Sequence, residues 1–143
     1  MTEMREHSAT IEIDAGPDKI WAIITNATAY PSFDPTCIRV EGGKAVEGAR
    51  LRVYSTFNPE RAFAVRVTTF APPRLMVWSG GMPFGLLRGV RTFEIDEVGP
   101  GRNRFSLSEN FSGPLLRLIS RSTPDMTEAF EGFCRGLKEL AEA

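Results

Sequence analysis

The sequence predicts an α+β fold in which a curved antiparallel sheet of about six to seven strands wraps around a long C-terminal helix, with two short helices after the first strand. Two observations predict it. Short segments in which apolar and polar residues alternate follow one another, separated by turn residues. Near the C-terminus, apolar residues instead recur every three or four positions, as in an amphipathic helix. One sheet and one long helix can bury their apolar faces only against each other, so the sheet must curl around the helix.

A strand and a helical corner are expected at the N-terminus. Residues 7–14 alternate between apolar and polar, which is typical of a half-buried strand. Pro17 suits the first turn of a helix, where its missing N–H would have had no partner. The apolar stripe of this helix consists of Ile20, Trp21 and Ile24. The two prolines of the segment 30–35, Tyr-Pro-Ser-Phe-Asp-Pro, are expected to stop the helix and to turn two aromatic rings inward.

The middle of the chain is expected to form an antiparallel meander. Alternation predicts strands over residues 37–41, 50–57, 63–68, 75–79, 87–97 and 102–112. We expect Asn58-Pro59-Glu60 to turn the chain after the second of these strands, and Pro72-Pro73 to end the third. Short spacing and direct connections between strands favour antiparallel pairing.

The end of the chain has the period of a helix. Its apolar stripe consists of Met126, Phe130, Phe133, Leu137 and Leu140, with Cys134 alongside. The residues Thr123-Pro124-Asp125 form a good helix start, because they supply a capping hydroxyl, a proline in the first turn and a negative charge at the positive end of the helix dipole. Residues 114–119 form an apolar lead-in. We therefore expect one long helix with a kink or break at Pro124.

Two motifs of the N-terminal corner resemble a known superfamily. Ala15 to Trp21 spell Ala-Gly-Pro-x-x-Ile-Trp, and Tyr30 to Pro35 spell Tyr-Pro-x-Phe-x-Pro. Together with the order of elements over nearly the whole chain, they resemble the SRPBCC superfamily. This group shares the helix-grip fold of START lipid-transfer domains, birch-pollen-type allergens and polyketide cyclases. The resemblance implies one large ligand cavity between sheet and helix. Many relatives carry Trp-Asn where this chain has Phe33-Asp34, at a corner that often lines the cavity mouth.

Composition narrows the class of protein. A length of 143 residues, 42% of them hydrophobic and 24% charged, predicts one globular domain over residues 1–143. The net charge of −1 argues against a general nucleic-acid binder. Only Cys37 and Cys134 are present, which favours a reducing compartment, and we expect a cytoplasmic monomer or homodimer. The first ten residues are polar and no apolar run approaches 18 residues, so neither a signal peptide nor integral membrane association is expected.

An inward-facing ion pair is the most specific site that the sequence predicts. If a hairpin folds about Gly99-Pro100-Gly101, residues whose numbers sum to about 200 face each other. The predicted pairs are Ile95 with Phe105, Phe93 with Leu107, and Arg91 with Glu109. Four of these six residues are strongly apolar, so that face should be concave, and Arg91 and Glu109 should then point inward. Two interpretations stay open: a structural salt bridge, or a pair that orients a polar group of a ligand.

An apolar pocket is expected around this pair. The residues proposed to bind the ligand are Trp78, Arg91, Phe93, Glu109, Phe111, Phe130, Phe133 and Leu137. Aromatic side chains that converge with few polar groups are typical of a small-molecule site, although the same spacing also fits an ordinary core. Gly89 leaves room in the sheet wall or serves its curvature. Asp34 is either a turn residue or a polar group at the mouth of the cavity.

Other kinds of site are poorly supported. His7 is the only histidine and lies at the start of the first predicted strand, which disfavours a Ser-His-Asp or Cys-His catalyst. Two cysteines and one histidine, far apart, do not make a zinc site, so no metal is expected. The loop 80–85 lacks the lysine of a phosphate-binding loop, and we expect no nucleotide and no other cofactor.

The resemblance implies three functions. The first is a carrier that holds a small hydrophobic ligand, such as a lipid, a polyketide or an aromatic metabolite, and needs only the cavity. The second is an enzyme of the polyketide cyclase or aromatase type, with Glu109 as a base and Arg91 stabilising an enolate oxygen. The third is a protein-interaction module of the chaperone-activator type. Because the chain has one histidine and no clear tyrosine on the predicted concave face, we assign no catalytic residue.

Overall fold

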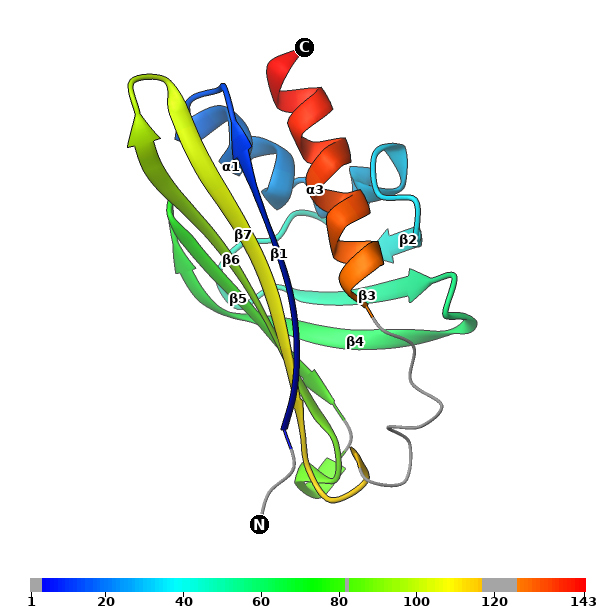
Figure 1. Ribbon diagram of the computed structural model, residues 1–143. Helices are drawn as coiled ribbons and strands as arrows, with labels where there is room; N and C mark the ends of the chain where they lie inside the picture. Colours follow the sequence, from blue (N-terminus) through cyan, green and yellow to red (C-terminus); the bar gives the residue numbers. More distant parts are fainter. Residues whose placement is uncertain (1–3, 82, 117–125) are drawn as a thin grey trace.

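The computed structural model describes residues 4–81, 83–116 and 126–143, and its strands form one curled sheet around a helix (Figure 1). The elements in chain order are β1 (Met4–Ile13), α1 (Pro17–Thr25), the 3-10 helix η1 (Ala27–Ser32), β2 (Cys37–Glu41), β3 (Arg50–Ser55), β4 (Asn58–Ala71), β5 (Leu75–Gly81), the 3-10 turn η2 (Pro83–Gly85), β6 (Arg88–Gly99), β7 (Arg102–Ser112) and α3 (Thr127–Glu142). This is the helix-grip arrangement that the sequence predicts, with its two short helices after the first strand.

The sheet has seven strands in the order β1-β7-β6-β5-β4-β3-β2, and each neighbouring pair is antiparallel. The strands β3 and β4 curve away from the long hairpin of β6 and β7, so that the sheet has a concave side on which α3 and α1 lie (Figure 1). The predicted meander is confirmed. The concave side is the only place where the apolar faces of sheet and helix can be buried together.

Several strand boundaries differ from the predicted ones, and two of these differences concern residues near the site. The turn between β3 and β4 lies two residues earlier than expected, because Ser55 pairs with Asn58 and leaves only Thr56 and Phe57 between them. The residues Asn58-Pro59-Glu60, which we expected to turn the chain, therefore begin β4. The first strand starts at Met4, so that His7 lies inside β1, where it is buried.

The N-terminal corner follows its local chemistry. Pro17 occupies the first position of α1, and the apolar stripe of Ile20, Trp21 and Ile24 is buried. One expectation is wrong: Pro31 does not stop this helix, which ends earlier, at Thr25, and Pro31 instead lies inside η1. A short 3-10 helix tolerates proline because its φ is close to the value that the proline ring imposes.

The corner packs tightly on α3 at two glycines of the helix. A Cβ atom on Gly136 would lie 2.1 Å from the carbonyl oxygen of Phe33, and one on Gly132 would lie 3.1 Å from the ring of Pro35. The rings of Tyr30 and Phe33 each lie 5.1 Å from the ring of Phe133, as centroid distances. The expected inward turn of both corner aromatics is thus confirmed. The missing side chains of the glycines let the backbone at residues 33–35 lie against the helix.

The apolar stripe of α3 is confirmed up to its last turn. Phe130, Phe133, Cys134 and Leu137 are buried, whereas Leu140 is 42% exposed and Ala141 is buried in its place. A period of 3.6 residues moves the buried face to position 141 after Leu137, so the prediction for Leu140 was wrong. The expected start at Thr123 and the kink at Pro124 lie outside the described residues; the described helix begins at Thr127.

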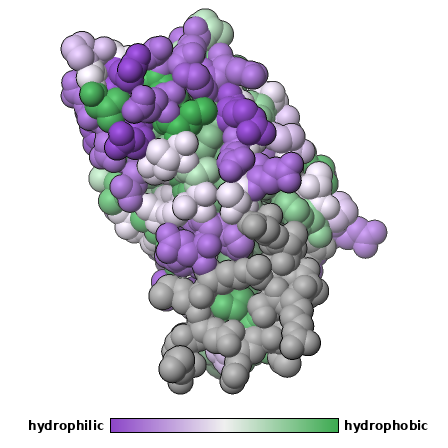
Figure 2. All heavy atoms as spheres, viewed as in Figure 1, coloured by the Kyte–Doolittle hydropathy of each residue, from purple (hydrophilic) through white to green (hydrophobic). Residues whose placement is uncertain are grey.

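The outer side of this arrangement is largely polar. Figure 2, drawn from the side of Figure 1, shows hydrophilic side chains over much of its coloured part, with smaller groups of hydrophobic ones among them. The outward face of α3 contributes Glu128, Glu131, Arg135 and Glu139. Within the part of the chain that the structure describes, no helix is long and apolar enough to cross a membrane.

Candidate ligand-binding cavity

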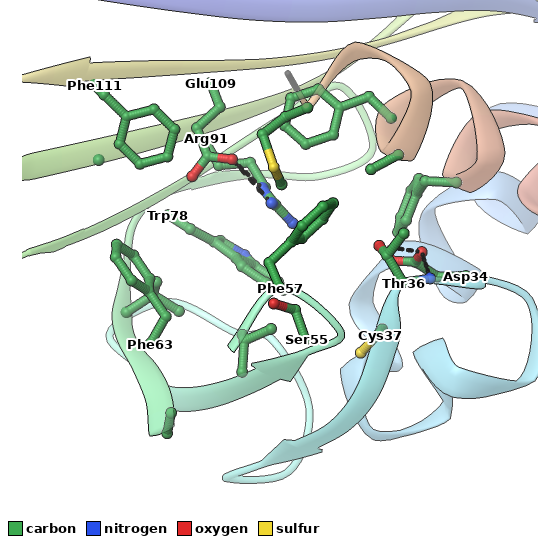
Figure 3. A pocket seen from close by; sticks show the side chains of 18 of the residues that line it. Asp34, Thr36, Cys37, Ser55, Phe57, Phe63, Trp78, Arg91, Glu109 and Phe111 are labelled. Atoms are coloured by element: carbon green, nitrogen blue, oxygen red, sulfur yellow. Dashed lines mark hydrogen bonds and ion pairs between the residues drawn. The ribbon is translucent and has the colours of Figure 1, made fainter. Parts of the chain in front are cut away.

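A cavity of about 570 Å³ lies between the concave side of the sheet and the first turns of α3. Its walls come from the corner after η1, from β2 to β7 and from α3, and Figure 3 shows many of these side chains from close by. The lining is mostly aromatic and aliphatic. It consists of Asp34, Thr36, Cys37, Val53, Ser55, Phe57, Arg61, Ala62, Phe63, Ala64, Val65, Trp78, Gly81, Leu87, Gly89, Arg91, Leu107, Glu109, Phe111, Met126, Ala129, Phe130 and Phe133.

Six of the eight predicted site residues line this cavity: Trp78, Arg91, Glu109, Phe111, Phe130 and Phe133. Phe93 and Leu137 do not, and both are fully buried in the core. Phe93 is packed between other rings, with centroid distances of 4.9 Å to Trp78 and 6.3 Å to Phe133. Leu137 lies one turn beyond Phe133, where α3 is packed against β1 and α1. Their assignment to the cavity lining is therefore corrected: they are part of the core beneath it.

The predicted ion pair is present in the predicted register. Arg91 pairs with Glu109, Phe93 with Leu107 and Ile95 with Phe105 between β6 and β7. The four apolar members are fully buried or in the cavity wall, which confirms that this face is concave. Arg91 donates from Nη2 and from Nε to Oε2 of Glu109, at 2.9 and 3.3 Å, and the two side chains are 19% and 7% exposed.

The ion pair keeps Arg91 charged inside an apolar wall. Burial acts to lower the pKa of Arg91, but the charge and hydrogen bonds of Glu109, together with smaller effects of Asp34 and Tyr30, outweigh it, and the net shift of that pKa is upward. The guanidinium carbon of Arg91 also lies 5.1 Å from the ring centroid of Phe130, at cation–π distance. Arg91 is thus held from two sides, by β7 and by α3.

Asp34 places a second carboxyl group in the cavity wall. The side chain is buried, and its Oδ1 accepts hydrogen bonds from the backbone N–H and the hydroxyl of Thr36, both at 3.0 Å (Figure 3). Burial raises the pKa of Asp34, although the donors of Thr36 and the charge of Arg91 act to lower it. Of the two roles that the sequence allowed, turn residue and cavity residue, Asp34 has both.

Two further polar groups of the lining are neutral. The indole Nε1 of Trp78 is buried and has no acceptor among the described residues, while the ring stacks on Tyr30 at 5.8 Å. Burial raises the pKa of the Cys37 thiol to about 11, so this side chain is a neutral thiol at physiological pH. Neither group adds charge to the cavity.

Several lining residues were missed from the sequence. Phe57 lies in the tight turn after β3, is 43% exposed and still lines the cavity; its place depends on the turn position that we predicted wrongly. Phe63 and Phe111 meet over Gly89, since a Cβ atom there would lie 3.3 and 3.1 Å from their rings. The alternation of Phe63 with Ala64 in its strand was a usable signal. The expected room in the sheet wall at Gly89 of β6 is the place where these two rings lie.

His7 lies close to this site without lining it. It faces Glu109 in the register between β1 and β7, and its ring makes an edge contact with Phe111 at 6.4 Å between centroids. It is therefore a buried residue of the concave face, inside β1 rather than at the start of the strand as expected. Among the described residues, no group of three or more histidine, cysteine or acidic side chains is arranged to hold a metal ion.

Comparison with known proteins places this architecture in a family. A family model described as "Polyketide cyclase / dehydrase and lipid transport" matches residues 4–142. The chain belongs to this family. Membership in the polyketide cyclase/dehydrase and lipid transport family agrees with the resemblance to the SRPBCC superfamily that the two corner motifs indicate. No curated protein matches the sequence.

Solved structures share the fold of this family member at low sequence identity. The Zhui aromatase/cyclase of a Streptomyces species is 14% identical, with a TM-score of 0.77 over 98% of this chain and 94% of that one. A START superfamily protein of Mycobacterium smegmatis is 17% identical, with a TM-score of 0.70 over 96% and 97%. Norcoclaurine synthase of Thalictrum flavum is 14% identical, with a TM-score of 0.74 over 97% and 94%. At these identities the likeness concerns the fold alone.

Proposed function

We propose that this protein binds a small hydrophobic ligand, such as a lipid, a polyketide or an aromatic metabolite, in the cavity between the sheet and α3. The observation that carries the proposal is the cavity of about 570 Å³ whose mostly apolar wall contains one buried ion pair, Arg91 with Glu109. Its volume lies within the roughly 300–1,000 Å³ of small-molecule sites, and a few polar groups in an apolar lining are their usual chemistry.

The ion pair supports an oriented ligand rather than a general apolar sink. Both hydrogen bonds from Arg91 end on Oε2 of Glu109, so Oε1 accepts none from the described residues. An apolar pair of similar volume would pack the wall at no electrostatic cost, whereas a buried ion pair costs desolvation energy. The pair therefore supplies a polar contact to a ligand group at a defined place in the wall.

The test uses N-phenyl-1-naphthylamine, a neutral probe whose emission rises in apolar sites. We expect saturable binding, and we expect Ala129→Phe to weaken it at least about tenfold because that side chain lines the cavity and a ring there would fill it. Ala22→Phe is the matched control, since Ala22 is exposed on α1. Equal binding by both variants would place the probe elsewhere on the protein. Native mass spectrometry of protein purified from its host would identify a retained ligand.

A second candidate is an enzyme of the cyclase or aromatase type, which the position of the ion pair in the cavity wall favours. In this case Glu109 removes a proton from a carbon between two carbonyl groups, and Arg91 stabilises the enolate oxygen. The carbon then attacks another carbonyl of the same chain, and protonated Glu109 returns its proton to the alkoxide oxygen that forms. The new hydroxyl group leaves as water together with the second hydrogen of the attacking carbon. A linear poly-β-ketone surrogate tests this: cyclised product should form with the wild type and not with Glu109→Gln, while both proteins bind the neutral probe.

A further inference from the structure

The cavity wall contains a carboxylate acceptor, Asp34, that is not part of the Arg91–Glu109 ion pair. We propose that Oδ2 of Asp34 accepts a hydrogen bond from a hydroxyl group of the ligand, and that Asp34 makes the cavity discriminate against ligands that carry a carboxylate. The inference rests on the proposed function and adds the polar chemistry of the ligand. It makes Asp34 a specificity-determining residue of the binding site.

The two oxygens of Asp34 have different environments. The side chain is only 7% exposed and lines the cavity, and both of its hydrogen bonds to Thr36 end on Oδ1. The N–H of Cys37 also acts on this carboxyl group, but it donates to the backbone oxygen of Asp34, at 3.2 Å. Among the described residues, no donor has hydrogen-bond geometry at Oδ2. Oδ2 is not among the fully enclosed polar atoms that lack a partner, so it is open to the cavity, and a ligand hydroxyl there would supply a hydrogen bond.

The charges around the cavity explain why the ligand group should be neutral. Besides the neutral thiol of Cys37, the buried ionisable groups of the described lining are two carboxyl groups, Asp34 and Glu109, and one guanidinium, Arg91. Both hydrogen bonds of Arg91 go to Glu109. The other cation of the lining, Arg61, is exposed, where water and salt screen its charge. A ligand carboxylate would thus add a third negative charge beside a single buried positive one.

A neutral hydroxyl also fits better than an ammonium group. Burial of a cation among aromatic side chains costs its hydration, and only one oxygen of Asp34 is open to pair with it. A hydroxyl donates one hydrogen bond, which is what Oδ2 can accept, and its removal from water costs much less. The structure therefore favours a phenolic or alcoholic ligand over an amine or an acid.

A matched set of naphthalenes tests this on the wild-type protein by isothermal titration calorimetry. At about pH 7, 2-naphthol is a neutral donor and 2-naphthoate is an anion, and 2-methoxynaphthalene lacks the donor. We expect 2-naphthol to bind most tightly, and the ether and the acid to bind about tenfold more weakly or worse, as for loss of one hydrogen bond to a charged group. Equal affinity for 2-naphthol and the ether, or tighter binding of the acid or of 2-naphthylmethylammonium, would overturn the proposal.

Asp34→Asn makes the test specific to this residue. The donors of Thr36 still require an oxygen at the Oδ1 position, so the new amide nitrogen takes the place of Oδ2 and turns an acceptor into a donor. We expect this variant to lose about tenfold in affinity for 2-naphthol and to gain in affinity for 2-naphthoate. Asp96→Asn is the control, because Asp96 is exposed and lies outside the cavity lining. The substitution changes the net charge by the same amount as Asp34→Asn.

The outcomes separate this inference from the proposed function. If 2-naphthol and the neutral probe both fail to bind, the proposed function fails. If they bind while Asp34→Asn keeps the preference of the wild type, the cavity is real and the role of Asp34 is wrong. Circular dichroism checks that Asp34→Asn is folded, and the ligand set on the wild type tests the preference without any variant.

Discussion

Arg91 and Glu109 pair across neighbouring strands through one carboxylate oxygen. Both donors of Arg91, Nη2 at 2.9 Å and Nε at 3.3 Å, point to Oε2. A fork-like pair would have engaged both oxygens of the carboxylate. The one-sided geometry stabilises the two charges within the wall and leaves the second oxygen, Oε1, available on the same concave face.

The pair should be strongly coupled in stability. Glu109→Leu or Arg91→Met alone should lower the free energy of unfolding by about 3 kcal/mol, because each leaves the other group without its partner in a buried place. The double variant Arg91→Met with Glu109→Leu should recover much of that loss. Urea denaturation of the four proteins gives the coupling energy. A value below about 0.3 kcal/mol would mean that the two side chains do not meet in solution.

Phe133 should be the most costly truncation on α3. Its ring packs against Tyr30, Phe33, Phe93 and Phe105, with centroid distances of 5.1 to 6.3 Å, so that little of it borders open space. Phe133→Ala should lower the free energy of unfolding by about 3–5 kcal/mol. Leu140→Ala, on the exposed side of the same helix, should change it by about 0.5 kcal/mol or less. Similar losses for both would contradict the face of α3 described above.

Gly136→Ala should destabilise the protein although alanine favours helices. The added Cβ atom would lie 2.1 Å from the carbonyl oxygen of Phe33, which is backbone and cannot move cheaply. We expect the free energy of unfolding to fall by about 1–3 kcal/mol. The clash outweighs the roughly 1 kcal/mol by which alanine normally stabilises a helix relative to glycine. Gly99→Ala is the control, since nothing lies within 4 Å of its Cβ position. Thermal melting of both variants measures the difference.

Stability should depend on pH through Asp34. Burial raises its pKa above the ordinary value of 3.8, so the folded protein binds this proton more tightly than the unfolded chain does. The resulting stabilisation is fully present below pH 3.8 and is lost as the pH rises through the raised pKa of the folded state. Relative to Asp34→Asn, the wild type should therefore lose stability from pH 3.8 upward. Urea denaturation of both proteins over this range checks the sign, and a relative gain by the wild type would contradict it.

The register of the β6–β7 hairpin and the stripe of α3 were predictable because both depend on local periodicity. The turn at Gly99-Pro100-Gly101 sets which residues face each other, and alternation sets the side on which they lie. Arg91 and Glu109 could thus be paired from the sequence. The same reasoning failed at Leu140. The prediction continued the stripe three positions beyond Leu137, whereas the buried residue in the structure is Ala141, four positions beyond it.

The extent of the cavity was decided by tertiary structure alone. Phe93 has the alternation of a lining residue, but Trp78 and Phe133 cover it, and Leu137 is covered in the same way by neighbouring elements. Conversely, Asp34 and Phe57 line the cavity from a corner and a turn that have no periodicity to read. Periodicity determines the face on which a side chain lies. Whether that face is filled or left open depends on which distant segments pack over it, and this is a property of the assembled fold.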